Sequence, residues 1–346
     1  MRADAHILVI RFSAMGDVTM TIPVIKNLLQ QNPRLRVTVV SNAFLQPIFE
    51  GLDRCYFYPA FLKDQHKGFA GLYRLYKELR KYASFDAVAD LHNVLRSTIL
   101  STFFRLTGCQ VETVDKGRSE KKELTRKDNK ICRQLTPMHE RYAAVFRQLG
   151  LQIKLQDTIP VYERRALPPV IFSILSAGKK IIGVAPFAQY KEKMYPIEKM
   201  KNIVSRLASE NNFILLFGAK GNEADTLQTW ATEMEFVKNI AGRYSLNEEL
   251  TIISNLDMMV SMDSANMHLA SLFKVPVVSI WGATHHYAGF YGWGQDINNI
   301  VQIDLYCRPC SVFGNKPCYR GDHACMNWIG EDIVLKKIAE ISNGII

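Results

Sequence analysis

The stretch Val260-Ser261-Met262-Asp263-Ser264-Ala265-Asn266-Met267-His268-Leu269-Ala270 decides the fold of this chain, because it predicts a buried strand that turns directly into a helix. An apolar run at 256–260 supplies the strand, and apolar residues at helical spacing follow the turn. A second apolar run at 275–280 predicts the next strand. At such a junction, the free backbone N–H groups and the positive dipole end of the helix bind anionic phosphate. The simpler alternative is that Asp263 or Ser264 caps the helix and does nothing more.

Strands and helices alternate on both sides of a proline-marked stretch, residues 152–179. This alternation predicts parallel sheets whose crossover helices cover both faces. We therefore predict two α/β domains, residues 1–160 and 161–346, the second with a cysteine-rich loop at 307–325 and a final helix. The predicted strands lie at 7–12, 36–40, 86–91, 111–114, 180–185, 213–218, 256–260 and 275–280, and the predicted helices at 18–29, 72–82, 94–106, 139–149, 197–207, 223–234 and after 267.

The composition is typical of a soluble protein with sizeable cores. The chain has 346 residues, 48% of them hydrophobic and 22% charged, and its length alone favours two domains. No apolar run approaches the roughly 18 to 20 residues of a membrane span. The first apolar run, at 7–10, is too short for a signal peptide, so we expect a cytoplasmic protein.

The net charge of +10 indicates an anionic partner without identifying it. Basic residues crowd the segment 116–133, where no periodicity is visible. This segment is either a solvated surface loop or a clamp for a phosphorylated or lipid-anchored acceptor. It lacks interleaved aromatic residues, which argues against nucleic-acid binding. Seven cysteines, an odd number, argue against a disulfide framework in a chain without an export signal.

A second turn at the end of a strand is Ser13-Ala14-Met15-Gly16-Asp17. Gly16 would permit positive φ or a close approach of the backbone to a ligand. Asp17 either caps the following helix or acts as a general base on an acceptor hydroxyl. The turn lacks the G-x-G-x-x-G spacing, which makes a nicotinamide-dependent enzyme a poor fit.

A lysine follows the first strand of the second domain, in Lys193-Met194-Tyr195-Pro196. Such a lysine can neutralise a leaving diphosphate as a point charge, although a plain surface lysine is the alternative. No D-x-D metal motif accompanies either turn. Leaving-group stabilisation would then rely on lysine, helix dipole and backbone donors, and no cofactor would be required for catalysis.

Four motifs in order along most of the chain resemble those of the bacterial lipopolysaccharide heptosyltransferases, glycosyltransferase family 9. The amino-terminal motif is Ile10 to Val18 with Pro23 downstream, and Asp90-Leu91-His92-Asn93-Val94-Leu95-Arg96-Ser97 resembles a D-L-Q-x-x-x-R-S element. Lys193-x-Tyr195-Pro196 comes next. The last motif is Asp263 to Ala270, followed by Val275-Pro276 and Trp281-Gly282-Ala283-Thr284.

The resemblance implies a GT-B fold, with two Rossmann-like, doubly wound domains facing across a cleft. It also implies an inverting transfer of heptose from ADP-heptose to the inner core of lipopolysaccharide (lipid A–Kdo), at the inner face of the cytoplasmic membrane. By position, Asp17 matches the general base and Lys193 the diphosphate-binding lysine. The expected substrate-binding residues are Ser13, Gly16, Arg96, Arg118, Asp263, Ser264, Ala265, His268 and Thr284.

The chain departs from the family pattern at three histidines. His92 stands where a glutamine is usual, and His285-His286 follow Thr284 where a proline-containing turn is common. The histidine pair is either a sugar contact or an ordinary exposed turn. These departures leave the identity of the donor sugar open.

Four cysteines gather in the spacing Cys307-x2-Cys310-x7-Cys318-x6-Cys325. The first pair has zinc-ligand spacing, and His323 could replace one thiol, so a structural zinc site is one hypothesis. Free cysteines and disulfides are the alternatives, the latter disfavoured in a reducing cytoplasm.

Three other functions remain open from the sequence: transfer from a different nucleotide sugar, nucleotide-sugar epimerisation, and non-catalytic binding of anions or nucleic acid. An acceptor-independent change in the sugar would reveal an epimerase. Salt-dependent nucleic-acid binding without nucleotide-sugar affinity would reveal the binding protein.

Overall fold

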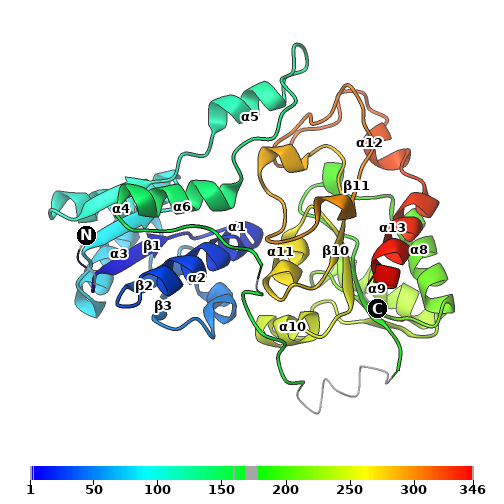
Figure 1. The fold of residues 1–346 in the computed structure, drawn as a ribbon, viewed down its shortest axis with the longest axis horizontal. Helices are drawn as coiled ribbons and strands as arrows, with labels where there is room; N and C mark the ends of the chain where they lie inside the picture. The colour runs from blue at the N-terminus through cyan, green and yellow to red at the C-terminus, as the bar shows by residue number, and fades with distance from the viewer. Residues whose placement is uncertain (1, 3, 159, 168–177, 345–346) are drawn as a thin grey trace. The chain divides into compact units, whose positions relative to one another are not determined.

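The computed structural model describes residues 2, 4–158, 160–167 and 178–344, which divide into two compact units (Figure 1). The first unit comprises Met1–Arg118 and Thr136–Val161, and the second comprises Ser119–Leu135 and Tyr162–Ile346. The segment 119–135 thus groups with the second unit, although the sequence pattern placed it within the first domain. None of the helices in the described ranges combines the length and the apolar character needed to cross a bilayer.

A parallel sheet forms the centre of the first unit, with strand order β3-β2-β1-β4-β5. The order reverses at β1, which pairs with both β2 and β4. In doubly wound sheets, ligands bind beyond the carboxyl ends of the strands at such a switch point. The strands are β1 (His6–Ile10), β2 (Arg36–Asn42), β3 (Cys55–Ala60), β4 (Ala87–Asp90) and β5 (Gln110–Thr113).

Helices pack on this sheet as the alternation of side chains along the strands requires. Leu8 and Ile10 of β1 face the same way and share one core with residues of α3 and α4. On α3, Leu72, Leu75 and Leu79 point into that core at helical spacing. The helical segments are α1 (Met15–Thr19), α2 (Thr21–Gln31), η1 (Ala43–Phe49), α3 (Gly68–Tyr82), α4 (Leu95–Leu106) and α6 (Met138–Gln148).

The second unit contains a parallel sheet of order β11-β10-β9-β6-β7-β8. Its order reverses at β6, which pairs with both β7 and β9. The loops after β6 and β9 therefore leave the sheet side by side at its switch point. The strands are β6 (Ile181–Ala185), β7 (Phe213–Leu216), β8 (Val237–Asn239), β9 (Met258–Met262), β10 (Val277–Ile280) and β11 (Ile300–Val301).

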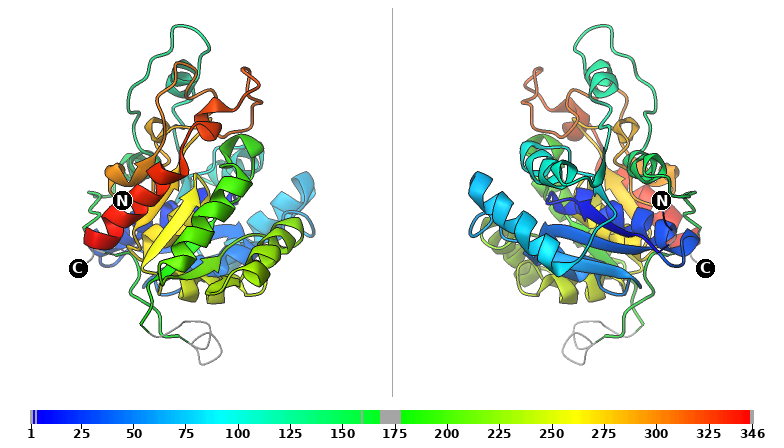
Figure 2. Two further views of the ribbon diagram at one scale, coloured as in Figure 1. Left: turned by 90° about the vertical axis from the view of Figure 1, so that its right-hand side faces the viewer. Right: turned by 90° about the vertical axis from the view of Figure 1, so that its left-hand side faces the viewer.

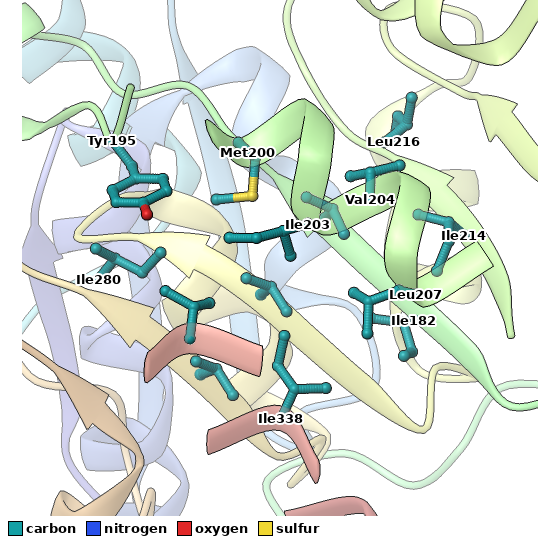
Figure 3. Packing of buried hydrophobic residues seen from close by; sticks show 14 of the residues in the cluster. Ile182, Tyr195, Met200, Ile203, Val204, Leu207, Ile214, Leu216, Ile280 and Ile338 are labelled. Carbon is teal, nitrogen blue, oxygen red and sulfur yellow. The ribbon is translucent and has the colours of Figure 1, made fainter. Parts of the chain in front are cut away.

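The core of the second unit lies between its sheet and helices that include α8, α9 and α13 (Figure 3). Helix α8 contributes Met200, Ile203, Val204 and Leu207, and α13 contributes Ile338. Figure 2 shows α8 and α13, in green and red, running beside the sheet. The helical segments of the unit are η2 (Lys191–Lys193), α8 (Ile197–Ser209), α9 (Asn222–Glu233), α10 (Leu246–Ile253), α11 (Ala265–Leu272), η3 (His286–Ala288), η4 (Ile297–Asn299), α12 (Ala324–Asn327) and α13 (Glu331–Gly344).

Several predicted elements differ from the observed ones. The segment 116–133, for which the sequence predicted either a solvated surface loop or an anion clamp and no regular element, contains α5 (Arg118–Leu124), which buries Lys121 and Leu124. The expected helix at 18–29 is two helices, and the first begins at Met15, so Asp17 is helical. The predicted connection at 152–179 lies partly outside the described residues, at 159 and 168–177.

Candidate active site

Asp17 lies at the switch point of the first sheet, in the first turn of α1. The N-cap position is Ala14 and no side chain caps the helix, so the capping alternative for Asp17 is not what the structure shows. Its Oδ2 accepts a hydrogen bond from Arg11 Nη2 at 2.7 Å, and its side chain is 25% exposed. The carboxylate is thus held from one side and open to solvent on another.

Arg11 fixes the orientation of Asp17. The arginine side chain is only 5% exposed, and its Nη1 donates to the carbonyl oxygen of Leu91 at 2.7 Å. Its guanidinium carbon also lies 5.8 Å from the centre of the Tyr142 ring. A guanidinium held by two hydrogen bonds and a ring leaves little freedom to its carboxylate partner.

Arg11 lies within the amino-terminal sequence motif, but no function was predicted for it from the sequence. The signal that would have found it is its position directly after the apolar strand residues 7–10, which predicts burial for a charged side chain. A buried charge requires a partner, and Asp17 is the nearest acidic residue in the sequence.

His92 and Lys116 complete the surroundings of Asp17. Burial, followed by repulsion from Arg11 and Lys116, lowers the pKa of His92 to about 3, so its imidazole is neutral. Its Nδ1 accepts from the backbone N–H of Phe12 at 3.3 Å. Burial, followed by repulsion from Arg11 and Arg118, lowers the pKa of Lys116, while Asp17 and Asp90 oppose the shift. A carboxylate among several cations suits an anionic acceptor with one hydroxyl to deprotonate.

The other predicted residues of the first unit lie around this centre. Arg96 is exposed in the first turn of α4, near enough to His92 to affect its pKa. Arg118 is exposed and donates from Nη2 to the carbonyl oxygen of Asn93 at 3.2 Å. Ser13 is exposed in the loop after β1. Gly16 is helical and is not among the described glycines with positive φ. Of the two reasons predicted for a glycine at this position, only the close approach of the backbone to a ligand remains.

The structure pairs Lys193 with Asp263 at the switch point of the second sheet. Lys193 Nζ and Asp263 Oδ2 lie 2.9 Å apart, and the two side chains are 14% and 10% exposed. Lys193 comes from the loop after β6 and Asp263 from the loop after β9, which are neighbouring strands. Lys193 is therefore not a plain surface lysine.

The first turn of α11 has no side-chain cap. Asp263 is engaged by Lys193, and the Ser264 hydroxyl lies 3.0 Å from the hydroxyl of Ser261. The capping alternative proposed for Asp263 and Ser264 is thus wrong for both side chains. Helix α11 begins at Ala265, so its first N–H groups and dipole end point at the space beside Lys193. This is the geometry that binds phosphate.

Two further predicted residues of the second unit are buried. His268 lies one turn into α11 and is 7% exposed. Thr284 is 1% exposed, and its hydroxyl has no hydrogen-bond partner among the described residues. An unsatisfied buried hydroxyl costs free energy, so a ligand or water bound at Thr284 would be stabilising.

His285 and His286 are buried, so the expectation of an exposed turn is wrong. Their rings stack with centroids 4.3 Å apart. Burial, followed by repulsion from the neighbouring ring and from Arg308, lowers the pKa of His285 to about 3. Burial and Arg308 lower the pKa of His286 to about 4. Both imidazoles are therefore neutral.

All four clustered cysteines, Cys307, Cys310, Cys318 and Cys325, line one small pocket together with His323. The Nε2 atom of His323 is buried and has no hydrogen-bond partner in the described part of the chain. The cysteines are free thiols. Over the described ranges, however, no group of three or more His, Cys, Asp or Glu side chains is arranged to hold a metal ion.

The cysteine-rich segment 307–325 also supports Lys193. Gly314 has φ of +75°, and a Cβ on it would lie 2.4 Å from Cγ and 2.5 Å from Cδ of Lys193. The backbone N–H groups of Cys310 and Ser311 donate to the carbonyl oxygen of Ala283, at 3.0 and 3.2 Å. The aliphatic part of the Lys193 side chain therefore packs against the backbone of Gly314, where no side chain intervenes. The hydrogen bonds of Cys310 and Ser311 to Ala283 fix the position of this backbone.

The buried histidines predict acid sensitivity. The pKa of a histidine in water, 6.5, falls in the folded chain to about 3 for His92, about 3 for His285 and about 4 for His286. As the pH drops below about 6.5, the unfolded state takes up protons that the native state does not, so the unfolding free energy falls. Glu249 acts oppositely, because burial raises its pKa from 4.5 to about 7. The three histidines outweigh Glu249 and give a net loss of up to ~3 kcal/mol per pH unit near pH 5, to which His6 adds because burial lowers its pKa as well.

Urea midpoints measured between about pH 7.5 and about pH 5 test this expectation. The variant His92→Gln should show a shallower dependence, since one of the three groups is removed. A midpoint that does not change over this range would contradict the burial of these imidazoles.

The comparisons with known proteins agree with one another. The sequence profile of glycosyltransferase family 9 (heptosyltransferase) matches residues 72–317, more than half of the chain. Lipooligosaccharide heptosyltransferase 2 of Campylobacter jejuni serotype O:6 is 26% identical, over 58% of this chain and 59% of its own length. Lipopolysaccharide heptosyltransferase 1 of Campylobacter coli is 24% identical, over 97% of this chain and 98% of that protein.

A solved structure shows the same fold. E. coli ADP-heptose lps heptosyltransferase II has a TM-score of 0.70 at 17% identity, and the likeness covers 98% of this chain and 99% of that one. At this identity the likeness concerns the fold alone. Together with the two parallel sheets, it confirms the predicted α/β fold of the GT-B type.

Proposed function

The chain belongs to glycosyltransferase family 9, and from this premise we propose that it is an inverting glycosyltransferase that moves a heptose from ADP-heptose to the inner core of lipopolysaccharide. The observation that carries the proposal is the Lys193–Asp263 pair next to the start of α11, which has no side-chain cap, because a cation beside free helix N–H groups suits a diphosphate. The names of the similar proteins indicate heptose as the sugar, lipopolysaccharide as the acceptor, and ADP as the nucleotide.

The proposed reaction is one displacement at the anomeric carbon of the donor. Asp17 takes the proton of an acceptor hydroxyl, whose oxygen forms the new bond to the anomeric carbon as the bond to the diphosphate breaks. ADP leaves with the bonding electron pair, and inversion follows from attack on the opposite face. Arg11 would position Asp17, because its guanidinium holds the carboxylate at 2.7 Å.

Lys193 and the first turn of α11 would stabilise the charge that develops on the leaving diphosphate. An ammonium group has three donors, so Lys193 can keep its contact with Asp263 and still bind a phosphate oxygen. Asp263 would then aim the lysine, and the Ser264, Ala265, His268 and Thr284 region would bind the rest of the donor.

We assign the two predicted domains to the two substrates. Residues 1–160, with Ser13, Gly16, Arg96 and Arg118 around Asp17, would bind the acceptor, whose core sugars carry carboxylates and phosphates that suit arginine. Residues 161–346 would bind the donor. Peripheral, charge-dependent association with the inner face of the cytoplasmic membrane would bring the enzyme to a lipid-anchored acceptor.

Release of ADP tests the proposal. The purified protein is incubated with ADP-heptose in the presence and absence of a heptose-deficient lipopolysaccharide core. ADP release that requires the acceptor supports a transferase. A change in the sugar without acceptor would instead indicate an epimerase, and nucleic-acid binding without affinity for ADP-heptose would indicate a binding protein.

Gly314 gives a prediction for the donor site. In Gly314→Ala, the new methyl group must displace the stem of Lys193, and φ of +75° strains any residue with a Cβ. We expect the KM for ADP-heptose to rise about tenfold or more, since a misplaced charge loses most of its interaction with the diphosphate. The matched control is Gly321→Ala, with φ of +80° but no atom within 4 Å of the added Cβ. An equal effect of both variants would show that backbone strain alone is responsible.

The four cysteines carry a second proposal, a structural zinc. The donor set fits, because four thiols and the unpartnered Nε2 of His323 line one pocket. Binding would require these side chains to draw closer than they are in the described residues. Zinc would then fix the segment whose Gly314 supports Lys193, without taking part in the transfer.

Metal analysis of the protein, purified under reducing conditions, tests the zinc proposal. We expect about one zinc per chain, and a Cys318→Ser/Cys325→Ser variant that lacks zinc and melts at lower temperature. Cys55→Ser and Cys109→Ser are the controls, since these cysteines lie in the first unit. A metal-free protein whose melting temperature is unchanged by added zinc would contradict the proposal.

A further inference from the structure

The outer surface of helices α3 and α4 carries exposed aromatic and aliphatic side chains among basic ones. The two helices belong to the first unit and lie next to each other (Figure 1). Phe69 and Tyr73 of α3 are 66% and 43% exposed, and Leu106 at the end of α4 is 79% exposed. Exposure of leucine and phenylalanine side chains to water is unfavourable, so burial of this apolar surface against a binding partner would lower the free energy.

These side chains form one continuous face. The ring of Phe103 on α4 lies 5.5 Å from that of Phe69 and 5.4 Å from that of Tyr73, centroid to centroid. Phe69 and Tyr73 are four residues apart and Phe103 and Leu106 three apart, so each pair lies along one side of its helix. Lys77 continues the stripe on α3, with its ammonium 4.8 Å from the centre of the Tyr73 ring.

The charge of the two helices is predominantly positive. Helices α3 and α4 together carry six basic residues and one acid, Glu78. The basic residues are Arg74, Lys77, Arg80, Lys81, Arg96 and Arg105. The Glu78 carboxylate is already engaged, since Oε2 lies 3.0 Å from Nε2 of His66 and accepts from the Tyr58 hydroxyl at 3.0 Å. The two helices together therefore carry a net charge of about +5 (six basic residues less one acid), and Lys77 brings part of this charge onto the face.

We propose that this aromatic–basic face, formed by Phe69, Tyr73, Lys77, Phe103 and Leu106, docks on an anionic lipid bilayer. Aromatic and leucine side chains enter the boundary between head groups and acyl chains, while lysine and arginine bind anionic head groups. A protein partner fits less well, because lysine is depleted in the cores of protein interfaces and a second copy would oppose like charges. The inference draws on the proposed function only in expecting a lipid-anchored acceptor.

Sedimentation with vesicles tests the proposal. Vesicles are made of phosphatidylcholine alone or mixed with phosphatidylglycerol. We expect binding to the mixed vesicles only, weakened by added salt. The variant Phe69→Ser/Leu106→Ser should bind about tenfold more weakly or worse, and Lys77→Gln about fivefold more weakly. The controls are Phe44→Ser, which removes a 53% exposed phenylalanine elsewhere on the first unit, and Lys154→Gln.

Several outcomes would overturn the proposal. The proposal would be wrong if the wild-type protein did not bind anionic vesicles. It would also be wrong if the face variants bound these vesicles as tightly as the wild type. A dimer that Phe69→Ser/Leu106→Ser dissociates, with vesicle binding unchanged, would assign the face to a second copy. Thermal unfolding of each variant checks that it is folded.

An activity readout separates this inference from the proposed function. With a lipid-free core oligosaccharide, the face variants should turn over like wild type. With acceptor embedded in anionic vesicles, they should be about tenfold slower. Absence of turnover with either acceptor would count against the proposed function and leave the vesicle result standing by itself.

Discussion

Asp17→Ala is expected to lower kcat by about 10²- to 10⁴-fold while the protein remains folded, because a general base contributes that much to proton transfer. The KM for ADP-heptose should change little, since Asp17 lies in the unit assigned to the acceptor. The protein should still fold, because Asp17 caps no helix and Arg11 keeps its hydrogen bond to the carbonyl oxygen of Leu91, but some stability should be lost, because the 5% exposed Arg11 loses its carboxylate partner. Steady-state ADP release, with thermal unfolding of the same sample, measures both effects.

Two variants sharpen this prediction. Asp17→Asn keeps the shape and a hydrogen bond to Arg11 but cannot accept a proton, so it should be nearly as inactive as Asp17→Ala. Asp53→Ala removes an 88% exposed aspartate of the same unit and should act like wild type. If Asp17→Asn kept wild-type turnover, Asp17 would not be the base.

Lys193→Ala is expected to lower kcat by about 10²- to 10³-fold, the usual effect of removing one preorganised charge from a developing anion. It should also raise the KM for ADP-heptose, because the lysine would bind the ground-state diphosphate as well. The substitution leaves Asp263 without its partner in a largely buried place, so some loss of stability should accompany it.

Lys191→Ala is the matched control, since Lys191 lies in the same short 3-10 helix but is exposed. A double variant, Lys193→Ala/Asp263→Asn, separates stability from catalysis. It should regain part of the stability lost in Lys193→Ala and none of the turnover. If turnover returned with stability, the lysine would be structural.

The strongest sequence signals were those in which polar residues follow a buried strand. Asp17 and Asp263 were found because each lies in the turn that follows a predicted apolar strand, and the structure places both at the switch point of a parallel sheet. Their pairing with Arg11 and Lys193 was not predicted. The Lys193–Asp263 pair depends on β6 and β9 being neighbours in the sheet, and strand order cannot be derived from the local sequence. The Arg11–Asp17 pair is local, and it was missed because no partner was sought for the buried charge of Arg11.

Elements without a regular apolar pattern were missed. Helix α5 is mostly charged, and it is held by burial of Lys121 and Leu124 rather than by an amphipathic stripe. Strand β3 contains Pro59 and lies at the edge of its sheet, where the strand pattern is weak. The burial of His285 and His286 was missed because two adjacent polar residues after a strand usually indicate an exposed turn.

Chemical analysis of the acceptor tests the central claim most directly. A heptose-deficient lipopolysaccharide core is incubated with ADP-heptose and the wild-type protein, then analysed by mass spectrometry and by NMR of the anomeric signals. We predict that the core gains a single heptosyl residue in inverted anomeric configuration, and that it gains none with Asp17→Ala. An unmodified core, with ADP-heptose bound and intact or its sugar altered, would contradict heptosyl transfer.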